Sequence, residues 1–78
     1  MDWVTLLNER IRRWRESRGL TKAELARRCG VSPEAVGQWE DDREDKRTTP
    51  TTANVAKIAG AVGIDVSVFW GVLPEQAS

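Results

Sequence analysis

Two polar side chains near the middle of the chain, Glu34 and Gln38, carry hydrogen-bonding groups that match the edges of nucleic acid bases. A glutamine amide can bond both N6 and N7 of adenine, and a glutamate carboxylate can accept from the N4 amine of cytosine. The two residues are one helical turn apart, so a helix would present both on one face. The alternative is that this helix face is simply exposed to solvent. The secondary structure predicted around Glu34 and Gln38 helps to decide between these two interpretations.

The segment that contains this pair predicts two short helices, over 22–29 and 33–41, joined by a tight turn. Thr21 precedes the first helix, and Glu24 three residues later completes the pattern of a capping box. Gly30 follows this helix, where the chain needs a left-handed backbone conformation. The apolar residues expected to face inward are Leu25, Ala26, Cys29, Val36 and Trp39. Two helices joined in this way form the unit that places a helix in the major groove of DNA.

The remaining chain predicts three more helices and no strand. A first helix over 3–18, with Asp2 as its N-cap, carries an apolar stripe at steps of three and four residues. A fourth helix is expected over 53–62, and a short fifth helix begins after Asp65. The polar stretch 42–50 reads as a loop.

These features resemble the Cro/repressor-type, or XRE-like, helix-turn-helix family. The matching residues are Ala26, Gly30, Val36, Trp39 and Glu40, and the flanking segments IRRWRESRGLT and NVAKIAGAVGIDVSVFW look like the family's first and last helices. The resemblance implies an all-α, compact five-helix lambda-repressor-like DNA-binding domain over 1–72. Its helix-turn-helix would occupy 21–40, and 73–78 would form a flexible C-terminal tail.

The resemblance also implies which residues meet DNA. The positions that contact bases in the family are occupied here by Pro33, Glu34, Gly37 and Gln38. Pro33 departs from the polar residue usual at its position and offers only apolar contact. The phosphate contacts would come from Lys22, Ser32, Arg43, Lys46 and Arg47. For each of these basic residues, the alternative is ordinary surface charge.

The loop after the predicted helix over 33–41 is longer than the turn usual at this place in the family. Four acidic residues lie among its basic ones, namely Asp41, Asp42, Glu44 and Asp45. Carboxylates near DNA would repel its phosphates, so we expect these side chains to point away, to pair with the loop's own cations, or to contact a partner protein.

Two further roles follow from the resemblance. Arg15 and Glu40 match a structural ion pair that links the first helix to the end of the third. Helix 5 corresponds to a region that often forms a two-fold dimer, which predicts a dimer interface at Val66, Val68, Phe69 and Trp70. The alternative for Trp70 is that it simply covers the core.

Composition narrows the classes of function. The 78 residues contain no His and one Cys, so the commonest general base, an internal disulfide and a cysteine metal cluster are all excluded. We therefore expect no enzyme, cofactor or metal site. No signal peptide or membrane span is visible, which favours a cytoplasmic, nucleoid-associated protein. The net charge is zero, but residues 1–39 carry eight Lys/Arg against five Asp/Glu, and the local field governs phosphate contact.

The sequence thus favours a DNA-binding transcriptional regulator that binds double-stranded DNA. The specific expectation is a small Cro-like repressor, bound as a homodimer to a pseudo-palindromic operator. The alternative is an antitoxin-like or other protein-interaction module of the same fold. Such a module would dock a protein partner through the acidic loop or helix 5.

Overall fold

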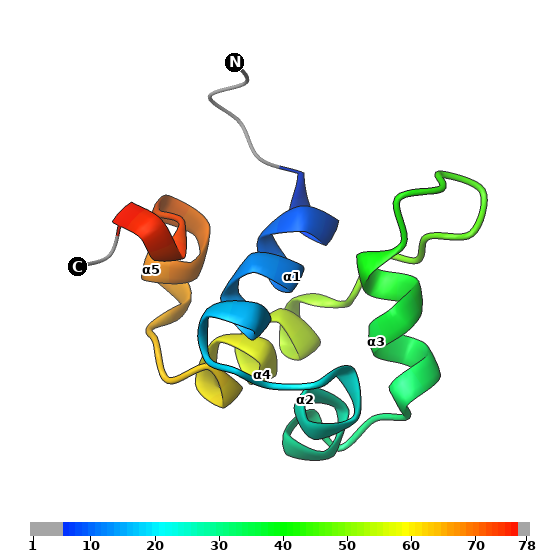
Figure 1. Cartoon of the computed structure of the whole chain (residues 1–78), viewed down its shortest axis with the longest axis horizontal. Coiled ribbons are helices and arrows are strands. Elements are labelled where there is room, and N and C mark those ends of the chain that lie inside the picture. Colours follow the sequence, from blue (N-terminus) through cyan, green and yellow to red (C-terminus); the bar gives the residue numbers. More distant parts are fainter. Residues whose placement is uncertain (1–5, 77–78) are drawn as a thin grey trace.

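The computed structural model describes residues 6–76, and all of its regular elements are helices (Figure 1). They are α1 (Leu7–Ser17), α2 (Lys22–Cys29), α3 (Pro33–Glu40), α4 (Thr52–Ala61), α5 (Val66–Gly71) and the 3-10 helix η1 (Pro74–Gln76). The prediction of an all-α architecture with five α-helices is confirmed, and residues 6–76 contain no strand.

Helix α1 begins later than the sequence predicts. Leu6 is extended, with φ −60° and ψ 149°, and its side chain is exposed. The predicted helix over 3–18 is therefore wrong at Leu6, because little packs against that residue to extend the helix. Asp2, its predicted N-cap, lies outside the described residues. Ile11 and Trp14 are fully buried and form the inner face of α1.

Local hydrogen bonds define the start of α2 and α3. The backbone N–H of Glu24 donates to Thr21 Oγ1 at 3.0 Å, and the Thr21 N–H donates to Glu24 Oε1 at 2.9 Å, so the capping box is present. Gly30 ends α2 with φ 72°, a conformation that glycine adopts without steric cost. Ser32 then caps α3 by accepting from the N–H of Ala35 at 3.2 Å. The two helices are therefore joined by a turn of only three residues.

One hydrophobic core joins the helices. Helix α2 packs on α3 and α4, α1 packs on α3, and α4 packs on α5. The buried apolar residues are Ile11, Trp14, Leu20, Leu25, Ala26, Cys29, Val36, Trp39, Val55, Ile58, Ala59, Val62 and Phe69. Burial raises the pKa of the Cys29 thiol, which favours its neutral form and suits a structural role.

Polar side chains of α1 hold the end of α5. The Arg10 guanidinium donates from Nη1 to the carbonyls of Phe69 and Val72, both at 3.0 Å, and Trp14 Nε1 donates to the Val72 carbonyl at 3.3 Å. Burial lowers the pKa of Arg10. These bonds satisfy carbonyls at a helix end that lack partners within the helix.

The segment for which a flexible tail is predicted contains η1. Arg13 pairs with Glu75 at 2.7 Å, and the Leu73 N–H donates to Gln76 Oε1 at 2.9 Å. The domain limits of 1–72 and 73–78 stay predictions. None of the helices over 6–76 combines the length and apolar character needed to cross a membrane.

Candidate nucleic-acid interface

Helix α3 has two faces of opposite character. Val36 and Trp39 are buried in the core, whereas Glu34 and Gln38 are exposed on the other side. Pro33 is also exposed, and Gly37 is half-buried between them. The helix therefore presents an amide and a carboxylate, one turn apart, to any molecule that lies along it.

A buried ion pair fixes α3 against α1. Arg15 Nε lies 2.7 Å from Glu40 Oε2, and Arg15 Nη2 lies 2.9 Å from Glu40 Oε1. The exposed fractions of the two side chains are 11% and 1%. Arg15 Nη1 also donates to the Leu20 carbonyl at 2.8 Å, and the bond to Glu40 raises the pKa of Arg15. Two parallel bonds of this kind define an orientation as well as a distance.

The starts of α2 and α3 carry two of the predicted phosphate contacts. Lys22 is the first residue of α2, and Ser32 is the N-cap of α3. Both are exposed, and within residues 6–76 no carboxylate forms an ion pair with Lys22. The Ser32 oxygen accepts from the helix, which leaves its hydroxyl proton free to donate.

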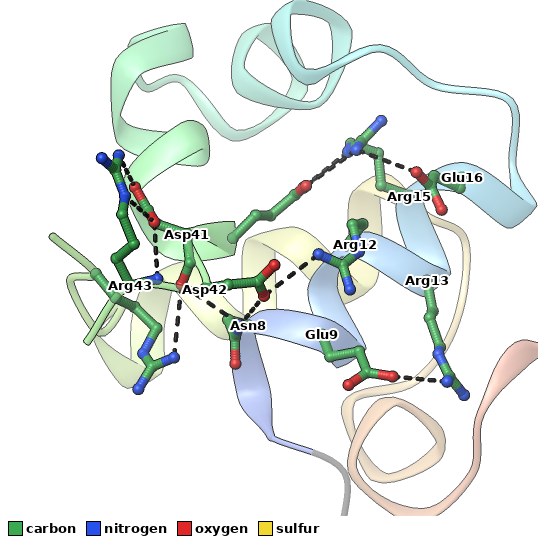
Figure 2. A network of polar contacts seen from close by, with 11 residues as sticks. Asn8, Glu9, Arg12, Arg13, Arg15, Glu16, Asp41, Asp42 and Arg43 are labelled. Atoms are coloured by element: carbon green, nitrogen blue, oxygen red, sulfur yellow. Dashed lines mark hydrogen bonds and ion pairs between the residues drawn. The ribbon is translucent and has the colours of Figure 1, made fainter.

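Asp41, directly after α3, holds two of the predicted phosphate contacts in the loop (Figure 2). Its carboxylate accepts from Arg43 Nε at 3.0 Å and from Arg43 Nη2 at 2.9 Å, and its carbonyl accepts from Arg47 Nη1 at 3.5 Å. The bonds from the Arg43 side chain, and then from its backbone, lower the pKa of Asp41 to about 2. Lys46 is exposed and forms no ion pair in the described part of the chain.

Asp42 turns in a different direction, toward α1. Its Oδ1 accepts from Asn8 Nδ2 at 3.1 Å and lies 3.5 Å from Arg12 Nη1 (Figure 2). The same Asn8 nitrogen donates to the carbonyl of Asp41 at 3.4 Å. The sequence analysis did not identify Asn8 and Arg12 as loop contacts, because no local pattern links residues 30 or more positions apart. Glu44 and Asp45 are exposed.

The four residues of α5 that are predicted at a dimer interface differ in their exposure to solvent. Phe69 is completely buried and belongs to the core of the subunit, which corrects its predicted place on an interface. Val68 is half-buried, whereas Val66 and Trp70 are 40% and 51% exposed. These two exposed side chains border an apolar hollow of about 380 Å³, also lined by Leu7, Pro50, Val55 and Ala56.

The described residues contain no group of three or more His, Cys, Asp or Glu side chains that could hold a metal ion. The candidate surface consists of one face of α3, the starts of α2 and α3, and the charged loop after α3. This arrangement defines a helix-turn-helix domain with an exposed second helix.

Comparison with known proteins gives the same class. A family model described as helix-turn-helix (HTH_3) matches residues 11–69. The solution structure of the DNA-binding domain of the P22 c2 repressor is similar, with a TM-score of 0.78 and 29% identity over 96% of this chain and 93% of that chain. The comparison with curated proteins gives no match.

Two crystal structures extend this similarity. The P22 c2 repressor in complex with synthetic operator 9T has a TM-score of 0.70 and 28% identity, over 87% of this chain and 97% of that chain. The restriction-modification controller protein C.AhdI from Aeromonas hydrophila has a TM-score of 0.70 and 25% identity, over 81% of this chain and 89% of that chain.

The chain belongs to the Cro/repressor-type (XRE-like) helix-turn-helix family. The family and the lambda-repressor-like fold expected from the sequence are thereby confirmed. Membership makes the chain a DNA-binding regulator of transcription rather than an enzyme.

Proposed function

We propose that this regulator recognises its operator with the outer face of α3 lying in the major groove. Gln38 reads an adenine and Glu34 a cytosine, while Pro33 and Gly37 allow close approach of the helix to the bases. The observation that carries the proposal is the division of α3, whose exposed polar side chains, Glu34 and Gln38, lie opposite buried Val36 and Trp39.

Phosphate contacts on either side of α3 fix its register on the duplex. Lys22 and Ser32 stand at helix starts, where free N–H groups and the helix dipole favour an anion. Arg43, Lys46 and Arg47 supply the second set of contacts from the loop. Contacts of this kind orient the protein without reading sequence, so specificity stays with α3.

The functional unit that we propose is a homodimer that acts as a repressor. Val66 and Trp70 of α5 are exposed beside an apolar hollow, and a second copy would cover them. Two recognition helices related by a two-fold axis would meet half-sites about 34 Å apart, which requires a pseudo-palindromic operator. The similarity to the P22 c2 repressor, one structure of which contains a synthetic operator, supports the role of an operator-binding repressor. We place the protein in the cytoplasm, with the nucleoid.

Selection of bound sequences from a random duplex pool, at near-physiological salt, tests this function. The expected result is enrichment of a two-fold palindrome whose half-site spacing matches one helical turn. If a folded protein enriches nothing, sequence-specific DNA binding is overturned. The favoured function would then be an antitoxin-like protein-interaction module that docks through α5 or the exposed acids Asp42, Glu44 and Asp45.

Substitutions at Gln38 and Lys22 should separate base reading from phosphate contact. Gln38→Ala is expected to lose about 1–3 kcal/mol of discrimination at particular base pairs. Lys22→Ala should instead weaken binding to all duplexes and reduce the slope of log affinity against log salt by about one per phosphate lost. Competition binding with single-base operator variants at several salt concentrations measures both effects. An unchanged operator preference in Gln38→Ala contradicts the base-reading role.

A further inference from the structure

Asp41 is an acidic residue at the end of the helix that we propose to bind DNA. It directly follows α3, and its N–H donates to the Gln38 carbonyl at 3.4 Å. Its carboxylate accepts three hydrogen bonds from Arg43, namely from the backbone N–H at 2.9 Å, from Nε at 3.0 Å and from Nη2 at 2.9 Å. One carboxylate thereby fixes both the backbone and the guanidinium of Arg43 relative to the end of α3.

The two partners differ in exposure. The Asp41 side chain is 19% exposed, whereas that of Arg43 is 69% exposed, so the guanidinium lies on the outer side of the pair. A guanidinium has five N–H groups in a fixed plane. The Asp41 carboxylate accepts from the single N–H of Nε and from one of the two N–H groups of Nη2. Both N–H groups of Nη1 and the second of Nη2 stay available to another anion.

This pair lies close to other groups on the proposed DNA-binding side. Asp41 lines a surface hollow together with Lys22 and with Gly37 on the outer part of α3. The charge of Lys22 is near enough to contribute to the lowered pKa of Asp41. Through its bonds to Asp41, Arg43 is thus connected to the part of the surface that carries Lys22 and Gly37.

We infer that Asp41 is a positioning residue for DNA binding, whose carboxylate orients Arg43 so that its outer N–H groups receive a backbone phosphate. The inference rests on the proposed function and assigns a favourable role to an acid beside a polyanion. A side chain that is already oriented loses less conformational entropy on binding, which corresponds to about a three- to tenfold gain in affinity. Simple charge repulsion between Asp41 and DNA predicts the opposite, namely that loss of this carboxylate strengthens DNA binding.

The sign of the effect provides the test. Asp41→Asn removes the charge but keeps an oxygen that can accept from the Arg43 N–H. It is expected to weaken binding of the selected duplex by about three- to tenfold, as measured by fluorescence anisotropy at near-physiological salt. In an Arg43→Ala background the same substitution should leave binding unchanged or tighten it, because only repulsion remains. Tighter binding in both backgrounds would overturn the inference.

Two further variants complete the experiment. Asp42→Asn neutralises a neighbouring acid that contacts Asn8 and Arg12 instead of Arg43, and it should not weaken binding. Arg43→Lys keeps both Asp41 and the positive charge but loses the bidentate geometry. It should weaken binding about as much as Asp41→Asn, and wild-type affinity in this variant would overturn the inference even if Asp41→Asn folds poorly.

The same measurements separate this inference from the function on which it rests. If the wild-type protein binds no duplex, the proposed function and the inference fail together. If the wild-type protein binds normally while Asp41→Asn binds more tightly, the proposed function stands and only the positioning role of Asp41 is overturned.

Discussion

Replacing Glu40 with alanine is expected to destabilise the fold by about 3–5 kcal/mol, because the substitution removes the buried counter-charge of Arg15 and leaves only exposed Glu16 at 3.8 Å. The two side chains are 1% and 11% exposed and share two hydrogen bonds of 2.7 and 2.9 Å. A 78-residue domain has a total stability of only about 4–12 kcal/mol. The variant should therefore unfold at a much lower urea concentration, as followed by circular dichroism.

A double replacement is the matched control for Glu40→Ala. Arg15→Met combined with Glu40→Leu removes both charges and restores apolar contact, so no unpaired charge stays buried. The Leu20 carbonyl loses its bond from Arg15 Nη1, which costs about 1–3 kcal/mol. The double variant should thus be more stable than Glu40→Ala. Equal loss in both variants would contradict an ion pair that acts mainly through its buried charge.

The ion pair also connects stability to DNA recognition. Glu40 is the last residue of α3, and Arg15 lies on α1, so the pair ties the C-terminal end of α3 to α1. A domain in which the pair is replaced by apolar groups should remain folded but hold α3 less rigidly. We therefore expect the double variant to bind DNA more weakly than the wild-type protein even under conditions where both are fully folded.

Sequence reasoning succeeded where the interactions are local. The capping box of Thr21 and Glu24 and the left-handed Gly30 involve residues within one helical turn, so their spacing identifies them. The family resemblance then supplied the Arg15–Glu40 pair, whose partners are 25 residues apart. Residue types alone would not have selected these two side chains from 24 charged ones.

The contacts that sequence reasoning missed are long-range and have no periodic signature. Arg10 donates to carbonyls 59 and 62 residues further along the chain, and Asn8 contacts Asp42 across 34 residues. An arginine on a charged helix looks like a solvated residue until the fold brings α5 beside it. Sequence reasoning also did not separate buried Phe69 from exposed Trp70. The two residues are adjacent on the short helix α5, so they point in different directions, and only the fold determines which of them faces the hydrophobic core.

Phe69→Ala is the second substitution with a large expected effect, a destabilisation of about 3–5 kcal/mol. The ring is completely buried, so its loss removes apolar contacts and leaves a cavity that the surrounding helices fill only in part. Trp70→Ala should cost the subunit only about 1 kcal/mol, because the indole is half exposed and its main aromatic contact is the edge-to-face pair with Phe69, at 5.6 Å. Urea unfolding of both variants measures this difference.

Self-association should show the reverse order. Val66 and Trp70 are the large apolar side chains that α5 exposes, and in the dimer that we propose they lie at the interface. Trp70→Ala is therefore expected to shift the protein toward the monomer in sedimentation velocity experiments, at a protein concentration where the wild-type chain associates. Phe69 offers no surface to a second copy, so Phe69→Ala should affect association only through loss of folding. A folded Trp70→Ala variant that still dimerises like the wild type would place the interface elsewhere. A palindromic operator would then be read by subunits joined through another face.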